Sequence, residues 1–388
     1  MPAVVGELRS DQPPLEELLS TLRRVANTAD ETGLPLPEAL EAVRGCGVLG
    51  LVIPVQYGGM GRDTVAVNRV VTDVARVDAS TAIILFQHFA VSARITDWGS
   101  DEQKRALLPR AAAGEWILAS GWSETGAGAD KRRVATTAQR LPDGGWTLNG
   151  AKSFTTGAGI ADLYLILAQS SKAQSSEDTG AASTYGADGQ SFFLVEAKKP
   201  GLIPEHGLDL VGMRASATGF IQLRSCQVGA DALLGPEGEA TRIIGTVRES
   251  GATLGAVSVG IAEAAYDILL DHVLKRGLTN QQAIRHRIVN LATQVEAARA
   301  IVERSGHRDT ADPGMTTLYS KLFASTTCET IVAEVHRMLG SAGFVRTHPV
   351  NRLGRDARAV ALMGPTNDVC RELVSAQCMT NRPEVTAP

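Results

Sequence analysis

A change of hydrophobic period, from helical to strand-like and back to helical, constrains the fold of this 388-residue chain more than any other feature. Apolar residues recur at helical spacing before residue 117 and again after residue 229. Between these limits, short apolar runs are separated by glycine-containing turn signals, a pattern typical of strands. Helices, then strands, then helices predict an α+β protein. Its predicted domains are an N-terminal α-helical domain (residues 1–116), a central β domain (117–229) and a C-terminal α-helical domain (230–388).

Local signals place several elements within these domains. Ser100, with Gln103 three residues later, predicts a capping box at the start of a helix. Residues 169–190 are rich in serine, alanine, glycine and threonine, and we predict a hairpin loop there because strand-like runs continue on both sides. The expected helices lie over residues 15–22, 37–44, 103–113, 252–273, 285–306 and 316–339, and the expected strands over 163–167, 191–195 and 219–223.

The composition argues against several classes of function. The net charge is −4 and no basic stripe is visible, so we expect no nucleic-acid partner. No apolar run reaches the roughly 18 residues that span a bilayer, and the first residues lack an apolar signal core, so we expect a cytoplasmic protein with no membrane partner. The cysteines lack metal-type spacing, so we expect neither a metal site nor a disulfide but buried free thiols. They are Cys46, Cys226, Cys328, Cys370 and Cys378.

Two glycine-containing motifs carry the strongest signal of function. They are Gly121–Asp130 (GWSETGAGAD) and Leu148–Thr156 (LNGAKSFTT). Together they resemble the flavin-binding strands of the acyl-CoA dehydrogenase family. The resemblance implies a homodimer or homotetramer of α-β-α subunits, each with a central β-barrel or sandwich, a C-terminal four-helix bundle and one FAD. Further segments match this family's motifs in the family's order, at residues 57–63 (YGGMGRD), 99–104 (GSDEQK), 211–216 (VGMRAS) and 349–358 (PVNRLGRDAR).

The second motif suits a flavin ring. The resemblance implies that Phe154 packs on the ring, that Thr156 lies near its N5 and that Ser123 contacts its polar edge. A ring held in this way performs the redox chemistry itself. An aromatic residue in a strand is also common in a protein core, so a core role for Phe154 is the alternative. The predicted ring-binding set is Trp122, Ser123, Phe154, Thr155 and Thr156.

The phosphate-binding part of the first motif departs from the family's pattern. Gly128 lets backbone N–H groups approach a phosphate. Ala129, however, replaces a common serine that bonds the pyrophosphate in the family. We predict FAD as the cofactor, with FMN as the alternative.

Three C-terminal segments are predicted to contact a cofactor. The family's RxxFG loop has lost its Phe-Gly part here, while Arg276 keeps a charge and Gln282 aligns with the helix that follows. Arg337 is predicted to pair with pyrophosphate oxygens, with an exposed helix arginine as the alternative. The resemblance adds the glycine turn after Arg337 and two residues near the C-terminus, which gives Gly340, Gly343, Thr366 and Asp368; for Asp368 a helix cap is the alternative.

The residue at the position of the family's catalytic glutamate is Gly364. Loss of a general base typically costs roughly 10²–10⁴-fold in rate. Some relatives carry the glutamate at the start of the long helix after the β domain, and Glu249 lies near that place. Alignment on Gly260 puts Ser250 there instead, and one residue rotates a helical side chain by about 100°. Glu249 is our candidate base, with a solvated carboxylate at a helix start as the alternative.

Two residues are predicted to contact the substrate, His88 and Ser120. His88 lies on an N-terminal segment that can line the substrate cavity. A hydrogen-bonded core histidine is the alternative interpretation.

Three functions fit these observations. The first is FAD-dependent oxidation of an acyl thioester, carried by CoA or an acyl carrier protein, at Cα–Cβ. The second is a flavin-dependent monooxygenase, because oxygen activation needs no α-proton abstraction. The third is a non-catalytic flavoprotein. Depending on the function, the partner is an electron acceptor protein, a reductase or O₂, and the altered site suggests specialised metabolism.

Overall fold

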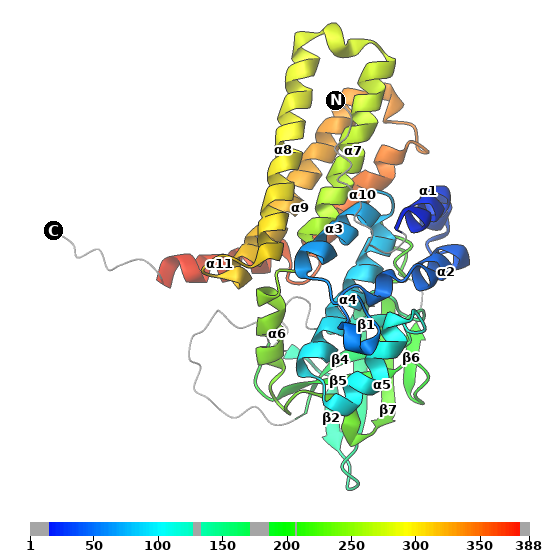
Figure 1. Cartoon of the computed structure of the whole chain (residues 1–388), viewed down its shortest axis with the longest axis vertical. Helices are drawn as coiled ribbons and strands as arrows, with labels where there is room; N and C mark the ends of the chain where they lie inside the picture. Colours follow the sequence, from blue (N-terminus) through cyan, green and yellow to red (C-terminus); the bar gives the residue numbers. More distant parts are fainter. Residues whose placement is uncertain (1–14, 127–132, 171–185, 206–207, 381–388) are drawn as a thin grey trace, which may run out of the picture.

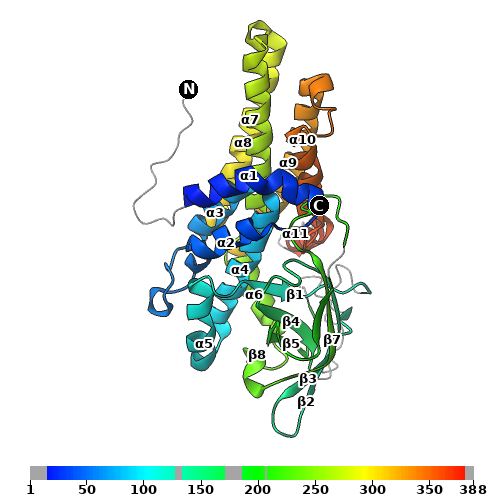
Figure 2. The ribbon, with the colours of Figure 1, turned by 90° about the vertical axis from the view of Figure 1, so that its right-hand side faces the viewer.

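The computed structural model describes residues 15–126, 133–170, 186–205 and 208–380. Figure 1 shows a sheet at the lower end of the molecule and long helices rising above it, and Figure 2 shows the same arrangement after a quarter turn. Helices therefore precede and follow the sheet in the chain, as the sequence pattern predicts. The boundaries placed at residues 116/117 and 229/230 stay predictions.

The N-terminal helices place one long, buried helix beside the sheet. This helix, α4 (Ala79–Trp98), packs against β1 (Leu118–Gly121). The Asp78 carboxylate caps it by accepting hydrogen bonds from the N–H groups of Ser80 and Thr81. The predicted capping box is confirmed at α5 (Asp101–Ala112), where Ser100 and Gln103 exchange hydrogen bonds. The other elements are α1 (Leu15–Thr32), α2 (Pro37–Gly45), α3 (Thr64–Ala75) and the 3-10 turns η1 (Val48–Gly50) and η2 (Val55–Tyr57).

The central region is an eight-stranded mixed sheet in the order β6-β7-β3-β2-β4-β5-β8, with β1 parallel to β4. The antiparallel pair β4–β5 begins its register at Gln169 opposite Gln190, which agrees with the predicted hairpin. Residues 171–185 of that loop lie outside the described residues. The strands after β1 are β2 (Thr137–Arg140), β3 (Trp146–Thr155), β4 (Leu163–Gln169), β5 (Gln190–Glu196), β6 (Leu202–Glu205), β7 (Gly219–Val228) and β8 (Leu233–Leu234).

Four long C-terminal helices pack on one another as a bundle. They are α7 (Gly255–Lys275), α8 (Gln282–His307), α9 (Pro313–Leu339) and α10 (Pro349–Leu362). α6 (Ala240–Glu249) precedes the bundle and α11 (Asn367–Thr380) follows it.

The start of the long helix after the sheet differs from the prediction. We expected it to begin at residue 252, but a break separates α6 from α7, which begins at Gly255. Gly251 lies in this break with a positive φ of 79°, and a Cβ there would come within 2.3 Å of the Ser305 carbonyl oxygen. Only glycine fits a left-handed position packed this closely, so the break is specified by Gly251.

Burial of the cysteines is confirmed for four of the five residues and wrong for one. Cys46, Cys226, Cys328 and Cys370 are buried free thiols, whereas Cys378 is exposed. Cys378 belongs to the last turns of α11, at the end of the described chain, where few elements remain to cover it. No helix among the described residues has the length and apolar character needed to cross a bilayer.

Candidate active site

Phe154 stands on a bulge of β3 and points its ring away from the core. The β3–β7 register shifts between Lys152 and Thr155, and Phe154 adopts a left-handed backbone with φ 51°. Its side chain is 63% exposed, so the core role considered for it does not hold. A bulky residue in this backbone region costs about 1–3 kcal/mol, and such strain is typical of functional sites. An exposed aromatic face held in this way suits stacking of a flat ring.

Two buried polar atoms of the two flavin motifs lack a partner within the described chain. They are Thr155 Oγ1 and Trp122 Nε1. Buried polar groups are nearly always hydrogen-bonded, so the unpartnered Thr155 hydroxyl next to the exposed Phe154 indicates that a ligand supplies the missing bond. Thr156 is held nearby, its Oγ1 3.3 Å from Thr218 Oγ1. The carbonyl of Ser123 accepts from the Ser153 N–H at 2.8 Å, which ties the first motif to β3. These residues fit a flavin ring.

A buried ion pair, Glu124 with Lys152, holds the two motifs together. Lys152 Nζ donates to Glu124 Oε1 at 2.6 Å, and both side chains are almost fully buried. Glu124 also accepts from the Thr136 hydroxyl and from the N–H groups of Ala135 and Thr136. Burial opposes ionisation of Glu124, but Lys152 and these donors outweigh it and lower its pKa. Burial lowers the pKa of Lys152 to about 8, against the attraction of Glu124.

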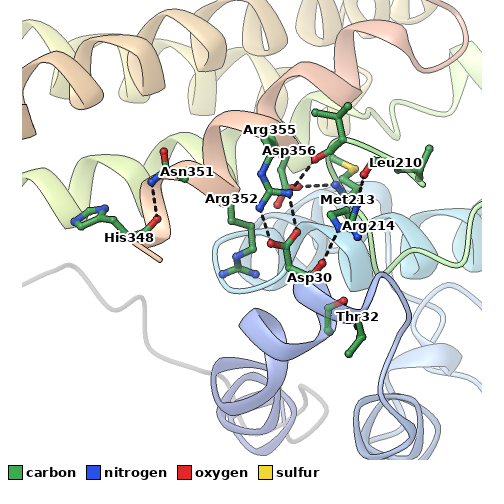
Figure 3. Close-up of polar contacts among 12 residues, drawn as sticks. Asp30, Thr32, Leu210, Met213, Arg214, His348, Asn351, Arg352, Arg355 and Asp356 are labelled. Atoms are coloured by element: carbon green, nitrogen blue, oxygen red, sulfur yellow. Dashed lines mark hydrogen bonds and ion pairs between the residues drawn. The ribbon is translucent and has the colours of Figure 1, made fainter. Parts of the chain in front are cut away.

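A polar cluster connects α10 of the C-terminal bundle to the turn that precedes β7 and to the end of α1 (Figure 3). On α10, the Asp356 carboxylate accepts from the Met213 N–H at 2.6 Å. Arg355 pairs with Asp30 at the end of α1 at 2.5 Å. Burial raises the pKa of Asp356 to about 7, against the Met213 hydrogen bond. A Cβ at Gly212 would lie 2.4 Å from the Arg355 carbonyl oxygen, so the turn and the helix are in direct contact.

The turn held by this cluster reaches Thr156. Ser216 Oγ lies 2.7 Å from Thr218 Oγ1, which in turn lies 3.3 Å from Thr156 Oγ1. The motif segments at 211–216 and 349–358 therefore position a residue of the flavin motif, although they are distant from it in sequence.

Lys321 fixes the loop that contains Gly364. Its Nζ donates to the carbonyl oxygens of Met363 at 3.0 Å and Pro365 at 2.5 Å, and to Asn367 Oδ1 at 3.1 Å. Ser325 also bonds Asn367, at 2.9 Å. Lys321 is 4% exposed, and burial lowers its pKa to about 8. Thr366 and Asp368 at this loop line a hollow of about 470 Å³ between α9, the end of α10 and α11.

Glu249 is the last residue of α6 and is exposed. It lies beside the start of α9, since a Cβ at Gly314 would be 3.7 Å from Glu249 Cγ. The alternative of a helix-start carboxylate is wrong, because the break at Gly251 places Glu249 at a helix C-terminus, where the dipole favours cations. Ser250, the competing position, caps α6 and donates to the Val247 carbonyl at 2.7 Å. The role of Glu249 as a base stays a prediction.

The two residues predicted to contact the substrate both lie where α4 meets the sheet. His88 is fully buried; its Nδ1 accepts from the Leu118 N–H at 3.2 Å, so its Nε2 donates to the Leu49 carbonyl at 3.0 Å. Burial lowers the pKa of His88 to about 4, so the neutral ring is the folded form. This geometry favours the alternative of a hydrogen-bonded core histidine. Ser120 is half-buried and donates to Gln87 Oε1 at 2.5 Å.

A second group of predicted cofactor residues lies at the far end of the bundle. Arg276 and Gln282 are exposed at the turn between α7 and α8, which Figure 1 shows at the opposite end from the sheet. Arg337 is exposed and pairs with Glu334 at 2.8 Å, ahead of Gly340 and Gly343. One subunit therefore does not bring this group to Phe154. Gly128 and Ala129 lie outside the described residues.

Most of the chain matches known sequences. Family models named acyl-CoA dehydrogenase N-terminal, middle and C-terminal domain match residues 17–115, 119–226 and 241–379. A cyclohexane-1-carbonyl-CoA dehydrogenase of Geobacter metallireducens is 30% identical over 368 residues, 91% of this chain and 92% of the relative. The protein therefore belongs to the acyl-CoA dehydrogenase family, whose members are FAD-dependent oxidoreductases acting on CH–CH bonds.

Solved structures agree on the fold. Butyryl-CoA dehydrogenase from Megasphaera elsdenii has a TM-score of 0.85 at 24% identity and covers 96% of this chain and 99% of its own. A dibenzothiophene monooxygenase from Paenibacillus has a TM-score of 0.80 at 22% identity and covers 95% and 97%. The same fold thus carries both dehydrogenases and monooxygenases.

Two buried lysines escaped the sequence analysis. Lys152 lies inside the second flavin motif, two residues before Phe154, and could have been flagged as a charge within a strand. Lys321 shares a helix face with Leu318, Ser325 and Cys328, all of them buried. A lysine on a buried face needs acceptors, and this requirement was the available signal.

Proposed function

We propose that the protein is an FAD-dependent dehydrogenase that oxidises an acyl thioester, carried by CoA or an acyl carrier protein, at Cα–Cβ. The observation that carries this proposal is the exposed Phe154 on its strained bulge, beside the unpartnered Thr155 hydroxyl. Membership of a family that oxidises CH–CH bonds supports the reaction type.

The residues on the strand side would hold and orient the cofactor. Phe154 would stack on the ring, Thr156, fixed by Thr218, would donate near N5, and Ser123 would meet the polar edge. The flavin held by these residues would supply the redox chemistry, acceptance of a hydride from the β-carbon of the thioester. The ion pair of Glu124 with Lys152 keeps the two motifs in register, so that these contacts are made by a rigid surface.

Glu249 is the base that we propose for the α-proton. It is an exposed carboxylate at the α6–α7 break and makes no ion pair with any residue that the structure describes. A free carboxylate can accept a proton, whereas Gly364, at the position of the family's glutamate, offers no side chain.

A monooxygenase is the second candidate, and Gly364 is the observation that favours it. Oxygen activation needs no α-proton abstraction, so the absence of a carboxylate at position 364 would carry no penalty in such an enzyme. The electron donor would then be a reductase and the acceptor O₂, in place of an electron acceptor protein. The acyl carrier, a homodimeric or homotetrameric state, the cytoplasmic location and a role in specialised metabolism remain further parts of the proposal.

Anaerobic mixing of the holoenzyme with acyl thioesters separates the two candidates. Bleaching of the flavin absorbance by a thioester alone is the result expected for a dehydrogenase. Bleaching only by NAD(P)H or a reductase, followed by oxygen-dependent product, would assign a monooxygenase.

Glu249→Gln tests the base in the same assay. Bleaching should slow by roughly 10²–10⁴-fold if Glu249 removes the α-proton. Glu239→Gln at the opposite end of α6 is the matched control, because Glu239 pairs with Arg242 at 2.7 Å and should be silent. Unchanged bleaching in Glu249→Gln rules out Glu249 while leaving the dehydrogenase assignment intact.

A further inference from the structure

Among the described residues, Arg94 is the one arginine over a tryptophan that makes no ion pair with a carboxylate. Four such stacks occur in the described chain, with guanidinium carbons 3.8 to 5.2 Å from the ring centroids. Arg110, Arg140 and Arg242 are about half exposed or more, and each also pairs with a glutamate. Arg94 is 7% exposed and makes no ion pair among the described residues; Asp97, one turn later on α4, attracts its charge without forming an ion pair.

The hydrogen bonds of Arg94 are equally incomplete. Its Nη1 donates to the Ala90 carbonyl one turn earlier, and its buried Nε has no acceptor. Trp122, whose ring lies 5.2 Å from the guanidinium carbon, also has its Nε1 buried and unpartnered. A buried ion that no counter-ion contacts costs free energy, and an arginine does not escape this cost by losing its proton. Burial lowers the pKa of Arg94 only to about 10, so the charge remains at neutral pH.

The position of Arg94 on α4 places it within the candidate active site. Residues seven or four apart share a helix face, so Arg94 lies on the face that carries Gln87 and Trp98. Gln87 accepts from Ser120, the β1 residue predicted to contact substrate. Trp98 Nε1 donates to Thr246 of α6 at 3.2 Å. Arg94 therefore lies between β1 and α6. The tryptophan under its guanidinium, Trp122, directly precedes Ser123 of the flavin motif.

We propose that Arg94 and the Trp122 indole N–H form an anion-binding subsite of the active site, which takes a carboxylate on the acyl group of the substrate. This inference rests on the proposed function and narrows its substrate class to thioesters with a second, anionic end. An anion there would supply a counter-charge in direct contact and accept from both unpartnered N–H groups, and a planar guanidinium suits a carboxylate. A phosphate of the carrier has the same chemistry and is the second source of such an anion.

Matched thioesters test the subsite. Succinyl and butyryl thioesters differ by a carboxylate in place of a methyl group, and adipyl and hexanoyl thioesters repeat the pair at greater length. Each acyl group is offered on CoA and on N-acetylcysteamine, which carries no phosphate. Dissociation constants are measured on the holoenzyme from the change in flavin absorbance and, independently of turnover, from thermal stabilisation.

The proposal predicts that, on both carriers, at least one carboxylated thioester binds at least tenfold more tightly than the neutral thioester of the same length. This preference should be lost in Arg94→Gln and retained in Arg94→Lys. Arg242→Gln is the control, since Arg242 also lies over a tryptophan but is exposed and paired. Trp122→Phe should give a smaller loss through its missing N–H. The flavin content and melting temperature of each variant are recorded, and Arg94→Lys with Trp122→Phe carries the test if Arg94→Gln does not fold.

The other outcomes are equally definite. A loss in Arg94→Gln that follows the CoA carrier and ignores the acyl charge supports an anion site but assigns it to phosphate. Equal affinities for charged and neutral thioesters in wild type, unchanged in the variants, overturn the subsite. If neutral thioesters still bleach the flavin in that case, the proposed function stands without it; if bound thioesters never bleach the flavin, the proposed function fails separately.

Discussion

Two buried lysines hold the two sides of the candidate site, and they do so by different chemistry. Lys152, on the sheet, meets a carboxylate, Glu124, at 2.6 Å. Lys321, in the bundle, meets only neutral acceptors, two carbonyl oxygens and the Asn367 amide. Burial lowers the pKa of both to about 8. The sheet side is thus a rigid surface with paired charges. The loop at Gly364 depends instead on one ammonium group, which donates to two backbone carbonyl oxygens and one side-chain amide.

The largest expected effect comes from removing one charge of the compensated pair. Lys152→Met leaves Glu124 buried without its cation and should lower the free energy of unfolding by about 3–5 kcal/mol. Urea unfolding of the holoprotein measures this loss. The double variant Lys152→Met with Glu124→Gln should recover part of it, and a purely additive result would show that the two side chains do not act as a pair.

The pH dependence of stability separates the two lysines further. A lysine pKa that falls from 10.5 unfolded to about 8 folded means that the unfolded chain binds more protons between these values, so stability rises with pH across this window. At about 1.4 kcal/mol per pKa unit, each lysine contributes up to roughly 3 kcal/mol of this rise.

Glu124→Gln should move the start of the window to lower pH for Lys152, because Glu124 raises the pKa of that lysine. It should leave the part due to Lys321 unchanged. Unfolding curves at pH 7 to 10.5 for wild type, Glu124→Gln and Lys321→Met measure both parts. A wild-type curve that coincides in slope with Lys321→Met would contradict the assignment for Lys321.

Removal of the uncompensated lysine should have a smaller and more local effect. Lys321→Met strands the oxygens of Met363, Pro365 and Asn367, which costs about 1–3 kcal/mol, but it leaves no buried charge. Faster amide hydrogen exchange confined to residues 363–370 is the expected signature. Lys275→Met on α7, where the side chain is 78% exposed, is the control. Uniform destabilisation with no local change would mean that Lys321 supports the bundle as a whole.

The two sides also differ in how much the sequence predicted. Short motifs and periodic patterns predict the sheet, the helical bundle and the candidate residues Phe154 and Thr156. They suffice there because strand residues alternate and neighbours in sequence remain neighbours in space. The exposure of Phe154 did not follow, since it depends on a bulge against β7. Glu249 was placed at a helix start because Gly251, which breaks that helix, acts through packing on Ser305, far away in sequence.

Contacts between segments that are distant in the chain could not be predicted from the sequence for the same reason. Lys321 and Met363 are 42 residues apart, and neither segment contains a pattern that predicts contact with the other. That Arg94 forms no ion pair is visible only once its contacts among the described residues are known. Motifs thus predict where the cofactor binds, whereas the groups that position the predicted binding residues are seen only in the fold.

The central claim is that a flavin ring stacks on Phe154, and cofactor binding tests it most directly. Apoprotein titrated with FAD, followed by flavin fluorescence, should take up one FAD per chain. Phe154→Gly should bind FAD at least tenfold more weakly while unfolding at equal or higher free energy, because glycine relieves the strain of the left-handed backbone. A protein that takes up no flavin, or a Phe154→Gly variant that binds it as tightly as wild type, would contradict the account.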